Sequence, residues 1–214
     1  MIRIAIDGPG GAGKSTVAKA VASELGIDYI DTGAMYRAVG YKMKTLGISP
    51  DDTEAVAHML ENTDIDFSHG DTLLDGKNVN KEIRQPEISA AASECSALPE
   101  VRKKLVALQR EMGTRKSVVM DGRDIGTNVL TDAEYKFYLT ASPEERARRR
   151  YNELLAKGIG ADYDAVLNDI KARDMNDMTR DIDPLRKAED AEEIDSSDMS
   201  ADDVTRYIIS RIDM

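Results

Sequence analysis

The segment Gly8-Pro9-Gly10-Gly11-Ala12-Gly13-Lys14-Ser15 decides the fold of this chain. It follows the apolar, β-branched run of residues 2–7, which predicts a buried strand, and it precedes apolar residues at helical spacing up to Leu25. A G-x-x-x-x-G-K-[ST] pattern between a strand and a helix is typical of a phosphate-binding loop. Its glycines let backbone N–H groups turn inward around phosphate oxygens, and the helix N-terminus adds partial positive charge. The sequence therefore predicts a nucleoside triphosphate site.

Two side chains of this loop carry specific expectations. Lys14 would reach the β- and γ-phosphates of ATP, and the Ser15 hydroxyl would be a ligand of Mg²⁺. We therefore expect ATP and Mg²⁺ as cofactors. The residues expected to bind ATP in this loop are Gly8, Pro9, Gly10, Gly11, Ala12, Gly13, Lys14, Ser15 and Thr16.

The same glycines allow a second interpretation. Gly8, Gly10 and Gly13 also fit G-x-G-x-x-G, and Asp31 ends the next predicted strand, as in a dinucleotide-binding fold. That fingerprint gives no role to the lysine and serine after the last glycine, whereas a triphosphate site uses both. It also leaves the arginines further along the chain unexplained, so we favour the triphosphate site.

Composition narrows the class of protein. The chain has 214 residues, 41% of them hydrophobic, and a formal net charge of −11. Such an acidic protein is poorly suited to coating nucleic acid or an anionic membrane. No apolar run approaches the roughly 20 residues that cross a bilayer, and residues 1–7 are too short for a signal peptide. We expect a cytoplasmic protein with no nucleic-acid or membrane partner.

Cysteine and histidine are scarce. The single cysteine, Cys95, has no partner for an internal disulfide, and together with two histidines it makes no metal site. His58 and His69 are expected on the surface.

Strands and helices alternate along most of the chain, which predicts an α/β fold with a mostly parallel sheet covered on both faces. Strands are expected at residues 2–7, 28–31, 118–122, 134–140 and about 191–195. Helices are expected at 14–25 and at about 34–46, 51–62, 86–97, 99–112, 143–157, 162–179 and 200–212. Residues 63–84 read as short strands with glycine-containing turns, and they predict a small antiparallel insert.

Arginines near the ends of predicted elements indicate the acceptor. A nucleoside monophosphate already presents an anionic oxygen, so its kinase needs guanidinium groups against charge repulsion rather than a base. Arg37 and Arg123 follow predicted strands, where open α/β sheets carry their sites. Further candidates are Arg173 and Arg180, which flank Asp177, and Arg146, Arg149 and Arg150, which share one face of the basic helix. Arg148 points elsewhere on that helix and reads as ordinary surface.

Several segments are distinctive when taken together. They are Ile6-Asp7-Gly8-Pro9 through Thr16, Asp31-Thr32-Gly33-Ala34-Met35-Tyr36-Arg37, Glu82-Ile83-Arg84, Ala92-Ser93 with Pro99-Glu100-Val101-Arg102, Asp121-Gly122-Arg123-Asp124-Ile125-Gly126-Thr127, Glu145-Arg146-Ala147-Arg148-Arg149-Arg150, and Arg173-Asp174 with Asp177 and Arg180. With these segments the chain resembles the bacterial cytidylate kinases over nearly its full length. The D-G-R-D-x-G-T string joined to D-T-G-A-x-Y-R is the most specific part of the likeness. Thr32 stands where some members carry serine, and Met175-Asn176 with Met178-Thr179 dilute a usually more charged stretch.

The resemblance implies an organisation and a set of roles. Within one P-loop kinase domain, 1–214, it implies a five-stranded parallel core formed by 1–31, 113–142 and 186–214, a monophosphate-binding lobe at 32–112 that carries the insert, and a lid with its following helix at 143–185. Contacts to cytosine are implied for Ser93, Arg102 and Asp124, acceptor-phosphate binding for Arg37, Arg123 and Arg180, and sugar contacts for Arg173 and Asp177. Thr32 joins this substrate-binding set, and Arg149 joins the ATP-binding set. The expected catalytic residues are Lys14, Arg123, Arg180, Arg146 and Arg150.

We therefore expect a monomeric kinase that moves the terminal phosphate of ATP to CMP or dCMP with Mg²⁺. A P-loop kinase for a small alcohol, such as a shikimate-type acceptor, is one alternative, and a nucleotide-responsive binding module without turnover is another. Asp121 has two interpretations that the sequence leaves open, an acid beside the magnesium ligand or a simple turn former.

Overall fold

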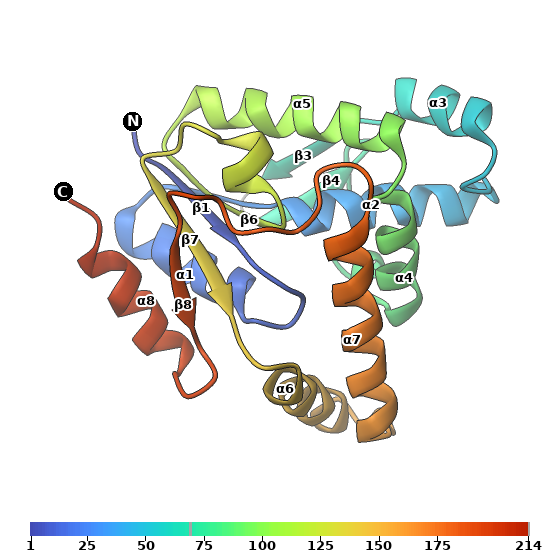
Figure 1. Ribbon diagram of the computed structural model, residues 1–214. Coiled ribbons are helices and arrows are strands. Elements are labelled where there is room, and N and C mark those ends of the chain that lie inside the picture. Colours follow the sequence, from blue (N-terminus) through green and yellow to red (C-terminus); the bar gives the residue numbers. More distant parts are fainter. Residues whose placement is uncertain (69, 214) are drawn as a thin grey trace. The chain divides into compact units, whose positions relative to one another are not determined.

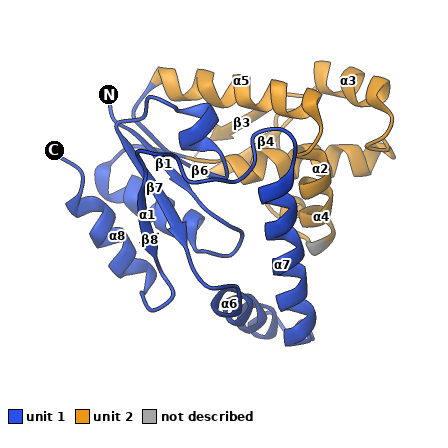
Figure 2. Cartoon of the chain, viewed as in Figure 1, with its two compact units in different colours: residues 1–29, 116–214 blue, residues 30–115 orange. Residues whose placement is uncertain are grey.

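The computed structural model describes residues 1–68 and 70–213, so His69 lies outside the described residues. The chain forms two compact units, which are coloured separately in Figure 2. Unit 1 comprises residues 1–29 and 116–214, and unit 2 comprises residues 30–115.

Most of a five-stranded sheet lies in unit 1 (Figure 1). Its strands are β1 (Arg3–Asp7), β2 (Asp28–Asp31), β6 (Val118–Gly122), β7 (Tyr135–Thr140) and β8 (Glu192–Asp195), in the order β2-β6-β1-β7-β8. The pairs β1–β6, β1–β7 and β7–β8 are parallel. The α/β fold with a five-stranded parallel sheet is therefore confirmed. Because β1 is central, Ile4, Ala5 and Ile6 are all fully buried, as expected for a strand covered on both faces.

Among its described residues, unit 1 contains the α-helices α1 (Lys14–Leu25), α6 (Pro143–Ala156), α7 (Tyr163–Thr179) and α8 (Ala201–Ser210). The helices α1 and α8 pack on each other, and α6 packs on α7. Apolar side chains of α1 and α8, including Val21 and Ile208, form one core with Phe137 and Leu139 of the sheet. This packing holds the loop between β1 and α1 at the carboxyl edge of the sheet.

One element of unit 1 has no counterpart in the expectations from sequence. Residues Ile125–Val129 form a π-helical turn, η2, directly after Asp124. Its hydrogen bonds run from the Val129 N–H to the Asp124 carbonyl and from the Leu130 N–H to the Ile125 carbonyl. A single turn of this kind leaves no periodic pattern of apolar residues, so hydrophobic spacing could not reveal it.

Unit 2 consists of helices and a small antiparallel sheet. Its elements are α2 (Thr32–Leu46), α3 (Thr53–Glu61), β3 (Ile65–Ser68), β4 (Asp71–Leu74), β5 (Lys77–Asn78), the short 3₁₀ helix η1 (Glu82–Arg84), α4 (Pro86–Cys95) and α5 (Pro99–Arg115). The order β3-β4-β5 confirms the expected insert within residues 63–84. The helix α2 begins two residues earlier than expected because the Asp31 carboxylate accepts the Ala34 N–H and caps it.

No helix within the described residues is long and apolar enough to cross a membrane. Cys95 is a free, buried thiol. Burial raises its pKa to about 12, so this thiol is unreactive in the folded protein.

Candidate active site

The phosphate-binding loop of unit 1 depends on its first glycine. Gly8 has a φ of 145°, and a Cβ at this position would lie 1.9 Å from the Leu139 carbonyl oxygen of β7. Only glycine tolerates both the backbone angle and the contact. The loop then enters α1 at Gly13, whose φ of 92° turns the chain into the helix. Strand packing therefore fixes the start of the loop.

The Lys14 side chain folds back onto its own loop. The side chain is buried, and its Nζ donates to the Pro9 carbonyl oxygen at 2.8 Å. Burial and the nearby charge of Arg123 lower the Lys14 pKa to about 7, against the opposing charges of Asp121 and Asp7. The negative charge of a phosphate in the loop would stabilise the protonated form of Lys14.

Ser15 is held by an acid of the neighbouring strand. Its Oγ donates to Asp121 Oδ2 at 2.8 Å, and the Tyr29 hydroxyl donates to Oδ1 of the same carboxylate at 2.8 Å. Asp121 is buried at the end of β6. A turn former has no reason to engage Ser15, so this geometry favours the interpretation of Asp121 as the acid beside the magnesium ligand.

These oxygens fit Mg²⁺. The described residues contain no group of three or more His, Cys, Asp or Glu that could hold a metal by itself. Mg²⁺ commonly uses only one or two protein oxygens and completes its shell with waters and phosphates. The Ser15 hydroxyl beside the Asp121 carboxylate is a donor set of that kind.

Two arginines meet the loop at Gly10. A Cβ on Gly10 would lie 3.4 Å from Arg123 Nη2 and 3.7 Å from Arg173 Cδ. Arg123 is held by Asp177 of α7, since its Nε donates to Asp177 Oδ2 at 2.8 Å. Burial alone would raise the Asp177 pKa, but the charge and hydrogen bond of Arg123 outweigh it and lower that pKa. The carboxylate therefore stays ionised beside the guanidinium.

Arg146 is the most completely held of the predicted arginines. It is 3% exposed, and its terminal nitrogens donate to the two oxygens of Asp174 at 3.0 and 2.6 Å. Its Nη1 also donates to the Gly10 carbonyl at 3.0 Å, and its Nε donates to the Ala141 carbonyl at 2.9 Å. Arg146 thereby fastens the loop, the end of β7 and the helix pair α6–α7 to one another.

The other arginines of α6 have different surroundings. Arg149 Nη2 donates to the Ser196 carbonyl at 2.6 Å, after β8, while Arg150 pairs with Glu153 on its own helix at 2.9 Å. The side chain of Arg148 is 68% exposed, as expected for ordinary surface. The three arginines predicted to share a face therefore engage three different neighbourhoods, because the partners of a helical residue are set by packing as well as by spacing.

Arg180 and Asp124 are also paired. Arg180 Nη2 donates to Asp124 Oδ1 at 3.2 Å, and Arg180 Nε donates to the Asp183 carbonyl at 2.7 Å. Both side chains are less than 10% exposed. The second carboxylate oxygen of Asp124 accepts from Asn128 Nδ2 at 3.1 Å.

In unit 2, Arg37 is oriented by the residue that caps its helix. Its Nη2 donates to Asp31 Oδ2 at 2.8 Å. Its Nε is buried and has no hydrogen-bond partner in the part of the chain that the structure describes. An unsatisfied buried donor on a cation is costly, and an anionic ligand would satisfy it. Thr32 lies in the first turn of the same helix and is 3% exposed.

Arg102 lies on α5 and is 2% exposed. Its guanidinium carbon is 5.8 Å from the centre of the Tyr36 ring, and its Nη1 donates to the Ser96 carbonyl at 3.4 Å. Ser93 is one turn earlier on the neighbouring α4, where its carbonyl accepts from Ser96 Oγ at 2.8 Å. The structure thus brings Arg102 and the Ser93–Ser96 turn together within unit 2.

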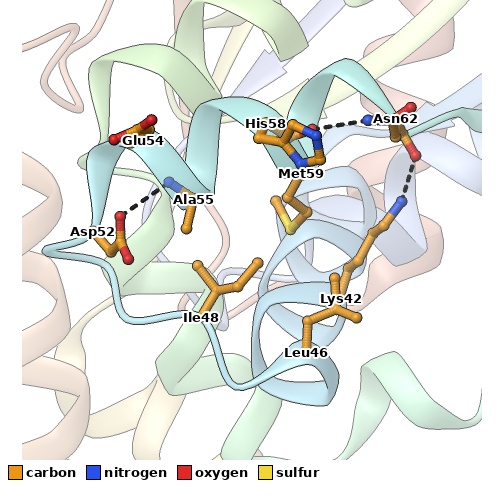
Figure 3. A pocket seen from close by; sticks show the side chains of 9 residues that line it. All are labelled: Lys42, Leu46, Ile48, Asp52, Glu54, Ala55, His58, Met59 and Asn62. Carbon is orange, nitrogen blue, oxygen red and sulfur yellow. Dashed lines mark hydrogen bonds between the residues drawn. The ribbon is translucent and has the colours of Figure 1, made fainter.

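A separate groove of about 640 Å³ opens on unit 2 between the end of α2 and α3 (Figure 3). Apolar side chains such as Leu46, Ile48 and Met59 line it, and Lys42 at its edge is already bonded to the Asn62 carbonyl and to Asp75. None of the predicted site residues lines this groove, so we do not assign it to the chemistry.

Sequence reasoning assigned no role to four residues that hold the predicted ones, namely Asp7, Tyr29, Asn128 and Asp174. The position of Asp174 was readable, since it lies three residues before Asp177 on the same helix. Asp7 ends a buried strand at the point where the loop begins, which also signals a functional acid. Tyr29 and Asn128 carry no such local signal.

The glycine-rich loop between β1 and α1 contains a buried lysine and a hydroxyl held by an acid, and the guanidinium groups of Arg123 and Arg146 lie beside it. These features define a P-loop phosphotransferase site. Comparisons with known proteins narrow the class. A family model described as cytidylate kinase matches residues 4–214. The cytidylate kinase of Caldicellulosiruptor bescii is 52% identical over 212 residues, which cover 97% of this chain and 94% of that protein. The cytidylate kinase of Clostridium acetobutylicum is 50% identical over 211 residues, covering 99% and 97%.

The chain therefore belongs to the cytidylate kinase family. An uncharacterized protein from Eubacterium ventriosum, known from a crystal structure, shares the fold with a TM-score of 0.54 at 17% identity, covering 99% of this chain and 98% of that chain.

Proposed function

We propose that this protein transfers the γ-phosphate of ATP to the phosphate of CMP or dCMP, with Mg²⁺. The observation that carries the proposal is the position of the Arg123 guanidinium, whose Nη2 would lie 3.4 Å from a Cβ on Gly10 of the phosphate-binding loop. Guanidinium groups beside the donor phosphates suit an acceptor that is itself a phosphate. Membership of the cytidylate kinase family indicates cytosine as the base.

Alignment and charge neutralisation would supply the catalysis. The positive charges of Lys14, Arg123 and Arg180 would stabilise the negative charge that spreads over the transferred phosphoryl group. The Ser15 hydroxyl, oriented by Asp121, would hold Mg²⁺, and the ion would supply positive charge against that of the phosphates. No base is needed, because the attacking oxygen is already anionic.

The remaining residues would bind the two nucleotides. Asp124 would accept a hydrogen bond from the N4 amine of cytosine, and Arg102 with Ser93 would contact the other polar groups of the base. Arg173 and Asp177 would meet the sugar, and Thr32 and Arg37 would hold the acceptor phosphate. The helix pair α6–α7 would act as a lid over ATP, with Arg146, Arg149 and Arg150 on its first helix.

We further propose that the protein works as a monomer in the cytoplasm and needs no nucleic-acid partner. The net charge of −11 supports the last point, since nucleic acid repels an acidic surface. Sedimentation of the purified chain across a range of concentrations tests the monomer.

A coupled ADP-release assay with CMP, dCMP, UMP, AMP and shikimate tests the proposal. We expect rapid MgATP-dependent ADP release with CMP and dCMP, slower release with UMP, and none with shikimate. Turnover with shikimate alone would favour a small-alcohol kinase. Tight ATP binding without acceptor-dependent ADP release would favour a binding module.

A further inference from the structure

Asp7 is a buried carboxylate that the proposed chemistry leaves unused. It ends β1 directly before the phosphate-binding loop and is 4% exposed. Its Oδ1 accepts the Ile125 N–H at 2.8 Å, and its Oδ2 accepts the Gly126 N–H at 2.7 Å. Both oxygens of Asp7 thus accept hydrogen bonds from the backbone of η2, the turn that follows Asp124.

The turn fits closely around this carboxylate. A Cβ on Gly126 would lie 3.2 Å from Lys136 Cδ and 3.4 Å from Asp7 Oδ2, so there is little space for the turn to shift. Burial raises the Asp7 pKa to about 6, against the two N–H groups that favour its charged form. A buried acid is a costly way to hold a turn, which indicates that the position of the turn matters.

The same turn also fixes the Asp124 side chain. Asn128, the fourth residue of η2, donates from Nδ2 to Asp124 Oδ2 at 3.1 Å, while Arg180 donates to Oδ1 at 3.2 Å. The Asn128 N–H donates to the Asp124 carbonyl at 2.9 Å, so its backbone and side chain both engage the same residue. The Asp124 carboxylate is therefore held at both oxygens and has little freedom to rotate.

We propose that Asp7 and Asn128 are positioning residues for base selection, because together they fix the backbone and the carboxylate plane of Asp124. The inference rests on the proposed function, in which Asp124 accepts the N4 amine of cytosine. Uracil presents an oxygen at that position, and a carboxylate that cannot turn away repels it. Selection against the wrong base needs such a fixed repulsive group. A loosened carboxylate would bind CMP less well and tolerate UMP better.

Steady-state kinetics on four variants test this inference, with CMP, UMP and ATP each varied. Asn128→Ala removes the amide, and Asp7→Asn replaces one carboxylate oxygen by an NH₂ group that faces a backbone N–H. We expect each to lower the CMP/UMP ratio of kcat/KM by roughly tenfold, as for loss of a hydrogen bond to a charged group. In Asn128→Ala the KM for ATP should stay within about twofold of wild type, because Asn128 is not among the ATP-binding residues. Asp7→Asn is judged on the CMP/UMP ratio alone, because the charge of Asp7 also acts on Lys14.

Lys136→Met is the matched control. Lys136 is buried against the same turn, but its Nζ binds the Thr131 carbonyl and Asp190 rather than Asp124. This variant should lower the melting temperature and leave the CMP/UMP ratio unchanged. Asn128 is only half-buried, so Asn128→Ala decides the question even if Asp7→Asn fails to fold.

Asp124→Asn distinguishes a failure of the positioning inference from a failure of the proposed function. If Asp124→Asn lowers the CMP/UMP ratio while Asn128→Ala and Asp7→Asn leave it unchanged, the positioning inference is overturned and the proposed function stands. In Asn128→Ala, an equal change in the KM values for CMP and ATP would overturn it as well, since that reports general damage. A wild-type enzyme that fails to phosphorylate CMP would overturn both.

Discussion

Two regions of unit 1 prepare for phosphate in different ways. The phosphate-binding loop, residues 8–15, relies on backbone N–H groups whose positions are set by β1, β7 and α1. The acid–arginine cluster, defined as the pairs Arg123–Asp177, Arg146–Asp174 and Arg180–Asp124, relies on long side chains that meet from distant parts of the chain. Backbone donors are ready for an anion, whereas each buried guanidinium is already neutralised by an aspartate.

The difference shows how an acidic protein can keep buried cations. An unpaired buried charge is very costly, and a carboxylate partner offsets that cost. Asp177 engages Arg123 through Nε, while Nη2 lies near Gly10 and is the donor that a phosphate would take. Arg146 instead donates hydrogen bonds from both terminal nitrogens and from Nε to other groups of the protein. Within the acid–arginine cluster, Arg123 therefore keeps a donor for a ligand, whereas Arg146 mainly stabilises the fold.

Lys14→Ala should have the largest effect, because it removes the one side-chain charge inside the backbone loop. We expect kcat to fall by about a thousandfold, the upper range for loss of a single transition-state donor. The melting temperature should change little, since Lys14 carries a burial cost in the ligand-free protein. Lys19→Ala, at an exposed position on the same helix, is the control. Near-normal turnover of Lys14→Ala would remove the lysine from the chemistry.

Arg123→Lys tests the ligand-facing side of the acid–arginine cluster. Lysine keeps the charge but cannot present paired donors to Asp177 and a phosphate at once, so we expect kcat/KM for CMP to fall by about a hundredfold. Arg148→Lys, at an exposed position, should behave like wild type. If the two substitutions have equal effects, Arg123 carries no special role.

Asp174→Asn tests the structural side of the cluster. It leaves the Arg146 guanidinium buried beside a neutral amide, and we expect the free energy of unfolding to drop by about 3 kcal/mol. The loss of kcat should be smaller than in Arg123→Lys. Urea denaturation together with the ADP-release assay measures both quantities. A catalytic loss without any loss of stability would show that Arg146 serves the ligand rather than the fold.

A change in proton binding is the smallest effect that we expect. The Lys14 pKa, lowered by burial to about 7, should rise when phosphate enters the loop, so at pH 8 ATP binding should take up close to one proton. ATP affinity should therefore weaken as pH rises above 7. Calorimetry with MgATP in buffers of different ionisation enthalpy measures the uptake, and Lys14→Met should abolish most of it. Proton release on binding would contradict the shift.

The loop was predictable from sequence because it is local. A contiguous motif between a strand and a helix determines its geometry, and the expected strands and helices of unit 1 are present with bounds shifted by only one or two residues. The antiparallel insert was predictable for the same reason, since glycine turns such as Asp75-Gly76 mark short hairpins.

The partners within the acid–arginine cluster could not be predicted. Arg180 and Asp124 are 56 residues apart, and Arg123 and Asp177 are 54 apart, so only the tertiary fold brings them together. Spacing on α6 suggested a common face for its arginines, but it could not distinguish the buried Arg146 from the half-exposed Arg150. The position of Asp7 signalled an acid near the loop, but its contacts could not be predicted, because they are backbone N–H groups in a turn that has no sequence signature.

The most direct measurement follows the γ-phosphate itself. Purified protein is mixed with Mg²⁺, CMP and ATP labelled at the γ-phosphate, and the products are separated after less than one turnover. Direct transfer between two nucleotides held by the loop and the arginines predicts that the label appears in the β-phosphate of CDP. Label found only in inorganic phosphate, or retained on the protein, would contradict it.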